Sequence, residues 1–304
     1  MALAGAAAAQ MPPDVAAKIK QVGPVLDPKM ISQMFELYTP LMPKPPAGLS
    51  VRENVAYGPD ERQRLDVFSP QNKAAGLLPV VIFVHGGGYV GGDKTRPGLP
   101  FYQNVGYYFA RKGLIGVNMT YRLAPRHPWP AGGEDVAAAV RWVKANIRGF
   151  GGDPKRLVLY GQSAGATHVA QYVFDESLQP PKDSDGVIGA ILQSGVFDPA
   201  GAPPGPNVDA YFGKDRETWG SKSLFRLLRG RSSIEIFLID AEYDPPPFKL
   251  QTEKMRDELC KLGARGCPRH MELTGHNHLS EILHLNTSDD LMGTRIVDFV
   301  RRLH

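Results

Sequence analysis

The distribution of apolar residues along the chain changes near residue 50. From there on, short and nearly continuous apolar runs alternate with longer segments of helical spacing. Strands in a mainly parallel sheet are buried on both sides, so this alternation predicts such a sheet with helices on both of its faces. The apolar runs are 80–85, 114–121, 156–161, 187–195 and 234–240, and two helical segments are 134–147 and 248–261.

The segment before residue 50 predicts two helical pieces that end at a Pro- and Gly-rich run. In the second piece, apolar residues recur at i, i+3, i+4 and i+7, which forms one apolar helix face. This face fits packing against the main domain, and it equally fits a lid over a substrate pocket, for which flexible methionines are well suited. The face comprises Ile31, Met34, Phe35 and Tyr38.

Length, composition and charge exclude several classes of protein. A chain of 304 residues can bury one large core, and 42% hydrophobic with 22% charged residues is typical of a globular protein. It has no apolar stretch long enough for a transmembrane helix. The 35 Lys and Arg and 31 Asp and Glu are scattered and leave a net charge of +4, which indicates neither a nucleic-acid nor a membrane partner.

The first ten residues and the cysteines bear on the cellular compartment in which the protein is expected. The opening Ala-rich stretch ends in Ala7-Ala8-Ala9, as a secretion signal could, but it has no basic start and only a short apolar part. We therefore expect a frayed terminus. Two cysteines, Cys260 and Cys267, cannot form a disulfide framework, and we expect both to be free thiols in a cytoplasmic protein.

A glycine-rich loop follows the apolar run 80–85. Gly86, Gly88 and Gly91 match the G-x-G-x-x-G spacing of dinucleotide-binding folds. Those folds also need a helix that begins at once and an acidic residue about 20 positions further on, which binds the ribose. Here prolines interrupt the segment after Asp93, and the next acidic residue is Glu134. The sequence therefore predicts no nucleotide cofactor.

The same loop is suited to binding a developing anion. Its three consecutive glycines, 86–88, let the backbone approach a ligand closely and turn N–H groups towards it. The loop also lies just beyond a predicted strand, where ligands bind in parallel sheets. Taken alone, the loop leaves open a second interpretation as a glycine-rich turn without a ligand.

A second motif predicts a serine nucleophile. Residues 161–165 are Gly-Gln-Ser-Ala-Gly and lie between the apolar run 156–161 and a helical segment. In this setting G-x-S-x-G holds the serine at the apex of a sharp turn, and the two glycines leave room for it. The helix that begins at Ala164 presents a free N–H and a positive dipole end to an anion beside Ser163.

A serine hydroxyl becomes a good nucleophile only when a nearby base takes its proton, and an acid orients that base. Along the chain the acid is expected after the serine and the histidine after the acid. Asp240, Glu242 and Asp244 are candidates for the acid. Asp244 is favoured because it lies in the loop beyond the strand. Position alone does not separate His276 from His278 as the base.

The histidines of this region also raise the alternative of a metal site. His276, His278, His284 and Glu281 lie close together in the sequence. Zinc sites usually need a closed set of three or four ligands, and the sequence has no other cluster of this kind. We therefore favour the serine site and predict no metal. The histidines that we assign to surface or supporting positions include His127, His168 and His270.

With these motifs, the chain resembles the hormone-sensitive-lipase-like branch of the α/β-hydrolases and shares features with arylformamidase-like esterases. The resemblance covers about residues 50–304. It rests on HGGGY at 85–89, on the block from Tyr121 to Gly165, on AEYDPPPF at 241–248 and on GHNHLSEI at 275–282.

The resemblance implies an α/β-hydrolase fold and a role for each motif residue. The family's nucleophile falls on Ser163, its acid on Asp244 and its base on His278. It implies neither a metal nor an organic cofactor. The backbone N–H groups that form the family's oxyanion hole fall on Gly86, Gly87 and Ala164.

The resemblance also implies a domain organisation. Residues 1–48 are expected to form a helical arm and part of a cap over the acyl pocket. Residues 49–304 are expected to form the catalytic domain, with a cap insertion at about 200–230. Two residues depart from the family pattern: Gln162 replaces the usual Asp, and His276 adds a second histidine to its loop.

The expected function is that of a serine carboxylesterase acting on short-to-medium-chain esters, so the expected partner is a small ester substrate. An arylformamidase with the same three residues is the first alternative, which the two departures leave open. A protein of this fold that binds a ligand without catalysis is the second alternative. The resemblance also allows for a homodimer.

Overall fold

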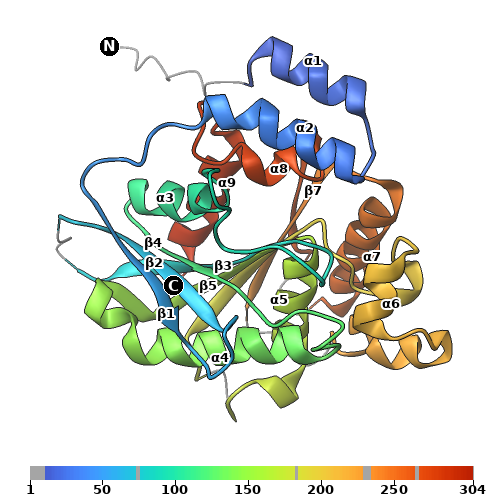
Figure 1. The fold of residues 1–304 in the computed structure, drawn as a ribbon. Coiled ribbons are helices and arrows are strands. Elements are labelled where there is room, and N and C mark those ends of the chain that lie inside the picture. Colours follow the sequence, from blue (N-terminus) through green and yellow to red (C-terminus); the bar gives the residue numbers. More distant parts are fainter. Residues whose placement is uncertain (1–10, 73–75, 182–183, 229–233, 264–266, 304) are drawn as a thin grey trace.

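The computed structural model describes residues 11–72, 76–181, 184–228, 234–263 and 267–303. The Ala-rich start lies outside these residues. Within the described ranges, eight strands form one sheet, which runs through the middle of the molecule (Figure 1). The strands are β1 (Leu49–Ala56), β2 (Arg64–Pro70), β3 (Leu78–Val84), β4 (Ile115–Met119), β5 (Gly152–Gln162), β6 (Val187–Gln193), β7 (Glu235–Tyr243) and β8 (Arg269–Asn277).

The sheet has the order β1-β2-β4-β3-β5-β6-β7-β8. Strands β3 to β8 are parallel to one another, whereas β2 pairs antiparallel with both β1 and β4. The parallel strands therefore end at one edge, where loops from several of them meet. The sheet and its helices confirm the predicted α/β-hydrolase fold class.

Helices cover both faces of the sheet. Along β3, Val80 and Ile82 pack in one apolar core with residues of α4 and α5, whereas Val81 and Phe83 pack on the opposite side with residues of α3 and α9. This alternation explains the continuous apolar run, because both sides of the strand are buried. The helices are α1 (Pro13–Val22), α2 (Pro28–Tyr38), α3 (Gln103–Arg111), α4 (Ala131–Asn146), α5 (Ala164–Phe174), α6 (Pro206–Phe212), α7 (Pro246–Leu262), α8 (Ser280–Leu283) and α9 (Leu291–Arg302).

Three strands were not among the predicted apolar runs. Strands β1 and β8 lie at the two edges of the sheet, and each exposes several side chains. Strand β2 is largely buried, but it contains Asp66, which interrupts its apolar pattern. An edge strand needs no continuous apolar run, because one of its sides faces solvent.

The N-terminal arm forms the two predicted helices. Helix α1 contacts β8, and α2 contacts α8, so the arm lies across the end of the molecule that carries the C-terminal segments (Figure 1). The predicted apolar face of α2 packs into the same core as one face of the sheet. Its buried residues Met34, Phe35 and Tyr38 stabilise this position by removing apolar surface from water.

The prediction of two free cysteines was wrong. Cys260, near the end of α7, and Cys267, just before β8, form a disulfide across the connection between these elements. Their Cα atoms are 4.2 Å apart, close enough for the two sulfur atoms to meet. The two cysteines are seven residues apart in the sequence, and this separation alone does not tell whether their sulfur atoms meet.

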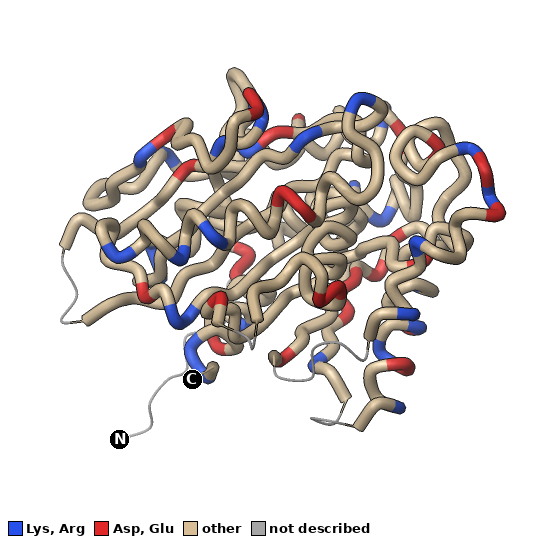
Figure 2. The backbone as a smooth tube through the Cα atoms, turned by 90° about the horizontal axis from the view of Figure 1, so that it is seen from below, with Lys and Arg blue, Asp and Glu red and all other residues tan. Residues whose placement is uncertain are grey.

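Charged residues of both signs are interspersed along the backbone (Figure 2). This pattern agrees with the small net charge of +4 for the whole chain. Within the part of the chain that the structure describes, no helix is both long enough and apolar enough to span a membrane.

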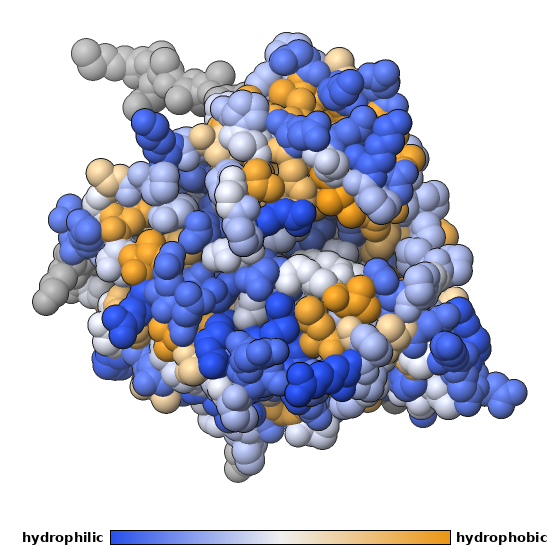
Figure 3. Space-filling view, viewed as in Figure 1, coloured by the Kyte–Doolittle hydropathy of each residue, from blue (hydrophilic) through white to orange (hydrophobic). Residues whose placement is uncertain are grey.

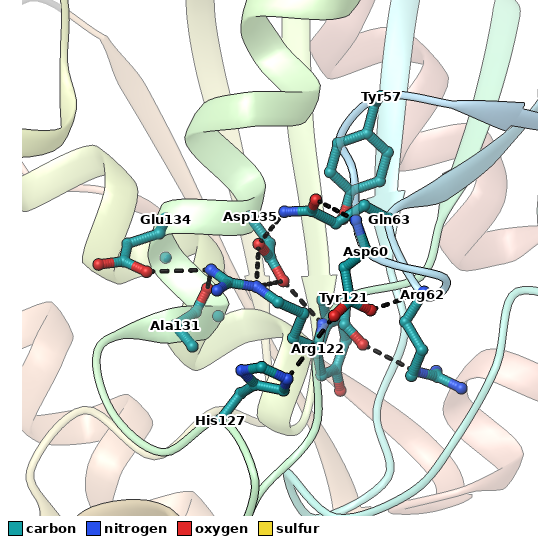
Figure 4. Close-up of polar contacts among 12 residues, drawn as sticks. Tyr57, Asp60, Arg62, Gln63, Tyr121, Arg122, His127, Ala131, Glu134 and Asp135 are labelled. Carbon is teal, nitrogen blue, oxygen red and sulfur yellow. Dashed lines mark hydrogen bonds and ion pairs between the residues drawn. The ribbon is translucent and has the colours of Figure 1, made fainter.

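A buried ion pair anchors the segment that follows β4. The Asp135 side chain in α4 is fully buried and accepts hydrogen bonds from Arg122 Nε at 2.8 Å, from the Arg122 backbone N–H at 2.7 Å and from Gln63 Nε2 at 2.7 Å (Figure 4). On the same arginine, Glu134 makes a more exposed contact at 3.0 Å. The pair thus connects the turn before β2 with the β4–α4 connection.

We expect Asp135→Ala to lower the free energy of unfolding by about 3 kcal/mol, because it leaves three donors without their buried acceptor. Urea unfolding followed by circular dichroism measures this loss. Glu134→Ala is the matched control, since it removes the exposed contact of the same arginine and should cost below about 1 kcal/mol. Equal losses in the two variants would contradict the anchoring role of Asp135.

Candidate active site

The predicted nucleophile lies in a strained turn between β5 and α5. Ser163 has φ 55° and ψ −123°, a conformation that non-glycine residues rarely adopt. A Cβ atom on Gly165 would lie 2.0 Å from the Val84 carbonyl oxygen, and one on Gly161 would lie 2.4 Å from the Gly165 carbonyl oxygen. Glycine is therefore required at both positions for the turn to pack against β3.

The structure brings Ser163, His278 and Asp244 together from three loops at the C-terminal edge of the sheet. His278 Nε2 lies 2.9 Å from Ser163 Oγ, and His278 Nδ1 lies 2.7 Å from Asp244 Oδ1. Asp244 follows β7 and His278 follows β8, and both are almost fully buried. The Phe248 ring packs on the imidazole with its centroid 4.2 Å away, which restricts the ring's orientation.

The other candidates for acid and base have different partners. Asp240 Oδ1 lies 2.6 Å from Nε2 of the exposed His270, and Glu242 accepts a hydrogen bond from the Gly275 backbone N–H at 2.7 Å. His276 lies beside Asp289, with Nε2 3.0 Å from Oδ2. The geometry therefore separates Asp244 and His278 from alternatives that sequence position left open.

The glycine-rich loop lies beside the serine. Gly86, Gly87 and Ala164 all line the same cavity as Ser163. Among the hydrogen bonds found outside helices and strands in the described residues, none uses the N–H of these three residues as a donor. Their N–H groups are therefore available to a ligand beside the serine hydroxyl.

Buried side chains hold this loop in place. His85 is fully buried, and burial lowers its pKa to about 4, so the ring is neutral at physiological pH. A neutral ring fits its contact with the Gly86 carbonyl at 2.6 Å, to which Nδ1–H can donate. Tyr121 stacks on this ring and donates its hydroxyl to the His85 carbonyl at 2.9 Å.

The serine opens into a cavity of about 890 Å³. The surface is hollowed beneath α2 in the space-filling view (Figure 3). Both the arm and the segment before α6 contribute to the lining, which includes Ile31, Phe35, Pro203, Val208, Phe248 and Leu279. The volume is typical of a small-molecule site, and the apolar side chains suit an apolar ligand group.

Two groups that sequence reasoning assigned no role here lie next to Asp244. Ser194, which follows β6, donates from Oγ to Asp244 Oδ2 at 2.6 Å. The fully buried Glu281 contacts the same hydroxyl at 2.8 Å. Ser194 lay inside the predicted run 187–195, so the sequence did not place it on a loop, whereas Glu281 had the signal of standing three residues after His278.

The residues that were weighed as metal ligands fall into two groups in the structure. Asp244, His278 and Glu281 form one, and His276, His284 and Asp289 form the other. Within each group the candidate ligand atoms lie within 4.8 Å of one another. His278 is directed to Ser163 and Asp244, so the histidines that are neighbours in sequence do not converge on one point.

The remaining histidines occupy different environments. His127 lies 3.6 Å from Asp60 at the surface, and His270 is exposed beside Asp240. His168 is fully buried next to the Tyr211 hydroxyl, and burial lowers its pKa to about 3. A neutral His168 therefore belongs to the aromatic packing between α5 and α6.

This geometry permits one kind of chemistry in particular. A neutral imidazole 2.9 Å from a serine hydroxyl can take its proton, while a carboxylate on the other nitrogen stabilises the imidazolium. Free N–H groups beside the serine can stabilise an oxyanion. The site is therefore equipped for acyl transfer.

Comparisons with known proteins agree with this fold. The BD-FAE family model matches residues 65–174. Esterase B from Lactobacillus rhamnosis has a similar structure, with a TM-score of 0.72 and 18% sequence identity, covering 95% of this chain and 97% of that chain. The chain has the α/β-hydrolase fold, and its residues 65–174 are similar to the BD-FAE family, in agreement with the resemblance seen in the motifs.

Curated relatives match part of the chain. Esterase LipC of Mycobacterium tuberculosis is 37% identical over 147 residues, which cover 46% of this chain and 35% of LipC. Isoprenylcysteine alpha-carbonyl methylesterase ICME of Arabidopsis thaliana is 39% identical over 178 residues, covering 59% of this chain and 36% of ICME. The matched region thus spans about a third of the length of these relatives.

The turn geometry yields a prediction about stability. Gly165→Ala should lower the free energy of unfolding by about 2 kcal/mol or more, because its Cβ cannot fit 2.0 Å from the Val84 carbonyl without backbone movement. Thermal and urea unfolding measure the change. Gly149→Ala is the control, since its Cβ would meet nothing within 4 Å. A Gly165→Ala variant as stable as this control would contradict the steric argument.

Proposed function

We propose that this chain is a serine carboxylesterase that hydrolyses short-to-medium-chain carboxylic esters through an acyl-enzyme. The observation that carries the proposal is the contact of His278 with both Ser163 Oγ and Asp244, at 2.9 Å and 2.7 Å. The esterase names of the relatives LipC and ICME support the same class of reaction.

In the proposed mechanism His278 takes the proton of Ser163 as the serine attacks the ester carbonyl. The N–H groups of Gly86, Gly87 and Ala164 stabilise the tetrahedral oxyanion, and the loss of one such donor typically costs about 3–4 kcal/mol of transition-state stabilisation. His278 then gives its proton to the departing alcohol. Water attacks the acyl-enzyme by the same steps and releases the acid.

Asp244 has an orienting role in this mechanism. It holds the proton on Nδ1 of His278, so that Nε2 faces the serine as the acceptor. It also stabilises the imidazolium that forms during the attack. The mechanism uses side chains and backbone N–H groups of this chain for every step.

The proposed substrate range comes from the family resemblance, and the apolar lining of the cavity supports it. Apolar side chains of the arm and of the segment before α6 line a space of about 890 Å³ beside Ser163. We propose that these two segments act as a cap that encloses a short or medium acyl group. A small ester is therefore the proposed partner.

The nucleophile assignment has a direct test. Ser163→Ala should abolish hydrolysis of p-nitrophenyl butyrate, and His278→Ala should lower kcat by about 10⁶-fold, because the serine then has no base. Both rates are read from the release of p-nitrophenol. His270→Ala is the matched control, since this exposed histidine also pairs with an aspartate but lies outside the cavity, and it should keep activity.

A fluorophosphonate probe separates catalysis from ligand binding. The wild-type chain should be labelled at Ser163, because the probe reacts with an activated serine, and Ser163→Ala should stay unlabelled. Mass spectrometry of the digested protein locates the label. A wild-type chain that binds esters but remains unlabelled would indicate a binding protein of this fold.

A substrate series tests the acyl range and the arylformamidase alternative. If the acyl range is the proposed short-to-medium one, kcat/KM should be higher for p-nitrophenyl butyrate than for the palmitate ester. N-formylkynurenine is the competing substrate in the same assay. A higher kcat/KM for this formamide than for every ester would reassign the chain to the arylformamidases.

A further inference from the structure

The hydrogen-bond chain of the site continues behind Asp244. Ser194 Oγ lies 2.6 Å from Asp244 Oδ2 and 2.8 Å from Glu281 Oε2. The three residues come from the ends of β6 and β7 and from α8, and at most 1% of each is exposed. We call this arrangement the Glu281–Ser194–Asp244 chain.

The number of protons in this chain is limited. The Ser194 hydroxyl has one proton and can donate it to only one of the two carboxyl groups. If both carboxyl groups were ionised, the other contact would place two acceptor oxygens within 2.8 Å of each other at a buried position. A proton on one of the carboxyl groups turns this repulsive contact into a hydrogen bond.

The surroundings indicate which carboxyl group holds the proton. Asp244 also accepts hydrogen bonds from the Ala241 backbone N–H at 2.9 Å and from His278 at 2.7 Å, and these contacts stabilise its ionised form. Glu281 Oε1 accepts one from Gln162 Nε2 at 2.9 Å, which leaves Oε2 to face Ser194. Burial, with the negative charge of Asp244, raises the pKa of Glu281 well above its ordinary value.

We propose that Glu281 is a protonated positioning residue, which donates a hydrogen bond to Ser194 so that Ser194 donates its own proton to Asp244. Glu281 thereby fixes the carboxylate that orients His278, without adding a second negative charge beside it. The proposal rests on the proposed function, because the orientation of His278 matters only if it serves Ser163 as a base.

Gln162 links this chain to the nucleophile turn. Its Nε2 donates to the Glu281 side chain and to the His278 carbonyl oxygen, both at 2.9 Å. Gln162 directly precedes Ser163, so the turn that holds the nucleophile also holds the loop of the base. The Gln162 amide therefore connects Glu281 to the nucleophile turn without adding a charge.

Two substitutions of Glu281 separate donation from charge. Glu281→Leu removes the donor at similar volume and should lower kcat about tenfold, with a smaller change in KM, because Ser194 loses its fixed orientation. Glu281→Gln can accept from Gln162 and donate to Ser194, and it should recover most of that loss. Failure of the glutamine variant to exceed the leucine variant in kcat, with both folded, would overturn the proposal.

The pH dependence of kcat/KM supplies a second readout. An ionised Glu281 would stabilise the His278 imidazolium, so its replacement by Gln would move the acidic limb to lower pH. With a protonated Glu281, the limb should stay within about 0.3 pH unit of the wild type. The titratable groups that face Glu281 are Asp244, His278, Tyr102 and Tyr160.

The role of Ser194 is tested by comparing its replacement with the replacement of another buried hydroxyl residue. Ser194→Ala should lower kcat about tenfold, because Asp244 loses one donor and Glu281 loses its acceptor. Thr252→Val is the control, since it removes a buried hydroxyl in α7 that has no hydrogen-bond partner. A Ser194→Ala variant with the kcat of this control would contradict the chain.

A measurement on the wild-type protein needs neither activity nor a folded variant. With ¹³C-carboxyl-labelled glutamate, one glutamate carboxyl carbon should keep the chemical shift of the protonated acid from about pH 5 to pH 8, where ordinary glutamates are ionised. Titration of every glutamate carboxyl near its ordinary pKa would overturn the proposal.

The pH dependence of the free energy of unfolding also reports the protonation state of Glu281. Above about pH 4.5, the unfolded chain releases the Glu281 proton while the folded chain keeps it, so unfolding releases a proton. The stability of the wild type relative to Glu281→Gln should therefore fall as the pH rises from there. A pH-independent difference would contradict the protonated state.

These readouts distinguish the inference from the function on which it rests. If the wild type hydrolyses no ester or formamide and stays unlabelled by fluorophosphonate, the proposed function fails, whatever the carboxyl shift. If the enzyme is active but every glutamate is ionised at pH 7, the function stands and the role of Glu281 fails.

Discussion

The backbone of Ser163 is the constraint on which the site depends. Its positive φ is maintained because β5 and α5 are both fixed by the core, and because the glycines at 161 and 165 allow the turn to touch β3. Strain at one residue is sustained only when its surroundings determine its position. The central sheet therefore supports the site by holding this turn.

The parallel arrangement of β3 to β8 brings the other residues of the site together. Because these strands end at one edge, residues that are distant in sequence meet there: Gly86 after β3, Ser163 after β5, Ser194 after β6, Asp244 after β7 and His278 after β8. Ser163 and Asp244 stand on very short connections between a strand and the next helix. Such connections restrict the side chains more than long loops would, and this restriction favours the short contacts of the site.

The sequence was informative where local pattern decides the structure. Continuous apolar runs predicted β3 to β7, and the glycine spacing predicted the turn at Ser163 and the loop at Gly86. The edge strands β1 and β8 escaped because solvent exposure removes the apolar signal, and β2 escaped because the buried Asp66 interrupts its apolar pattern. The choices between Asp240, Glu242 and Asp244 and between His276 and His278 depend on three-dimensional direction, which spacing does not encode. The disulfide and the contact of Ser194 with Glu281 are tertiary contacts, which sequence spacing does not encode either.

The N-terminal arm has a consequence beyond covering the cavity. Helix α1 packs on β8 and α2 packs on α8, and these two elements flank the loop that carries His278. Residues of the same α2 also line the cavity. The proposed entrance and the proposed base thus share contacts with one pair of helices. If the proposed function holds, a displacement of the arm that widens the entrance would also disturb the histidine.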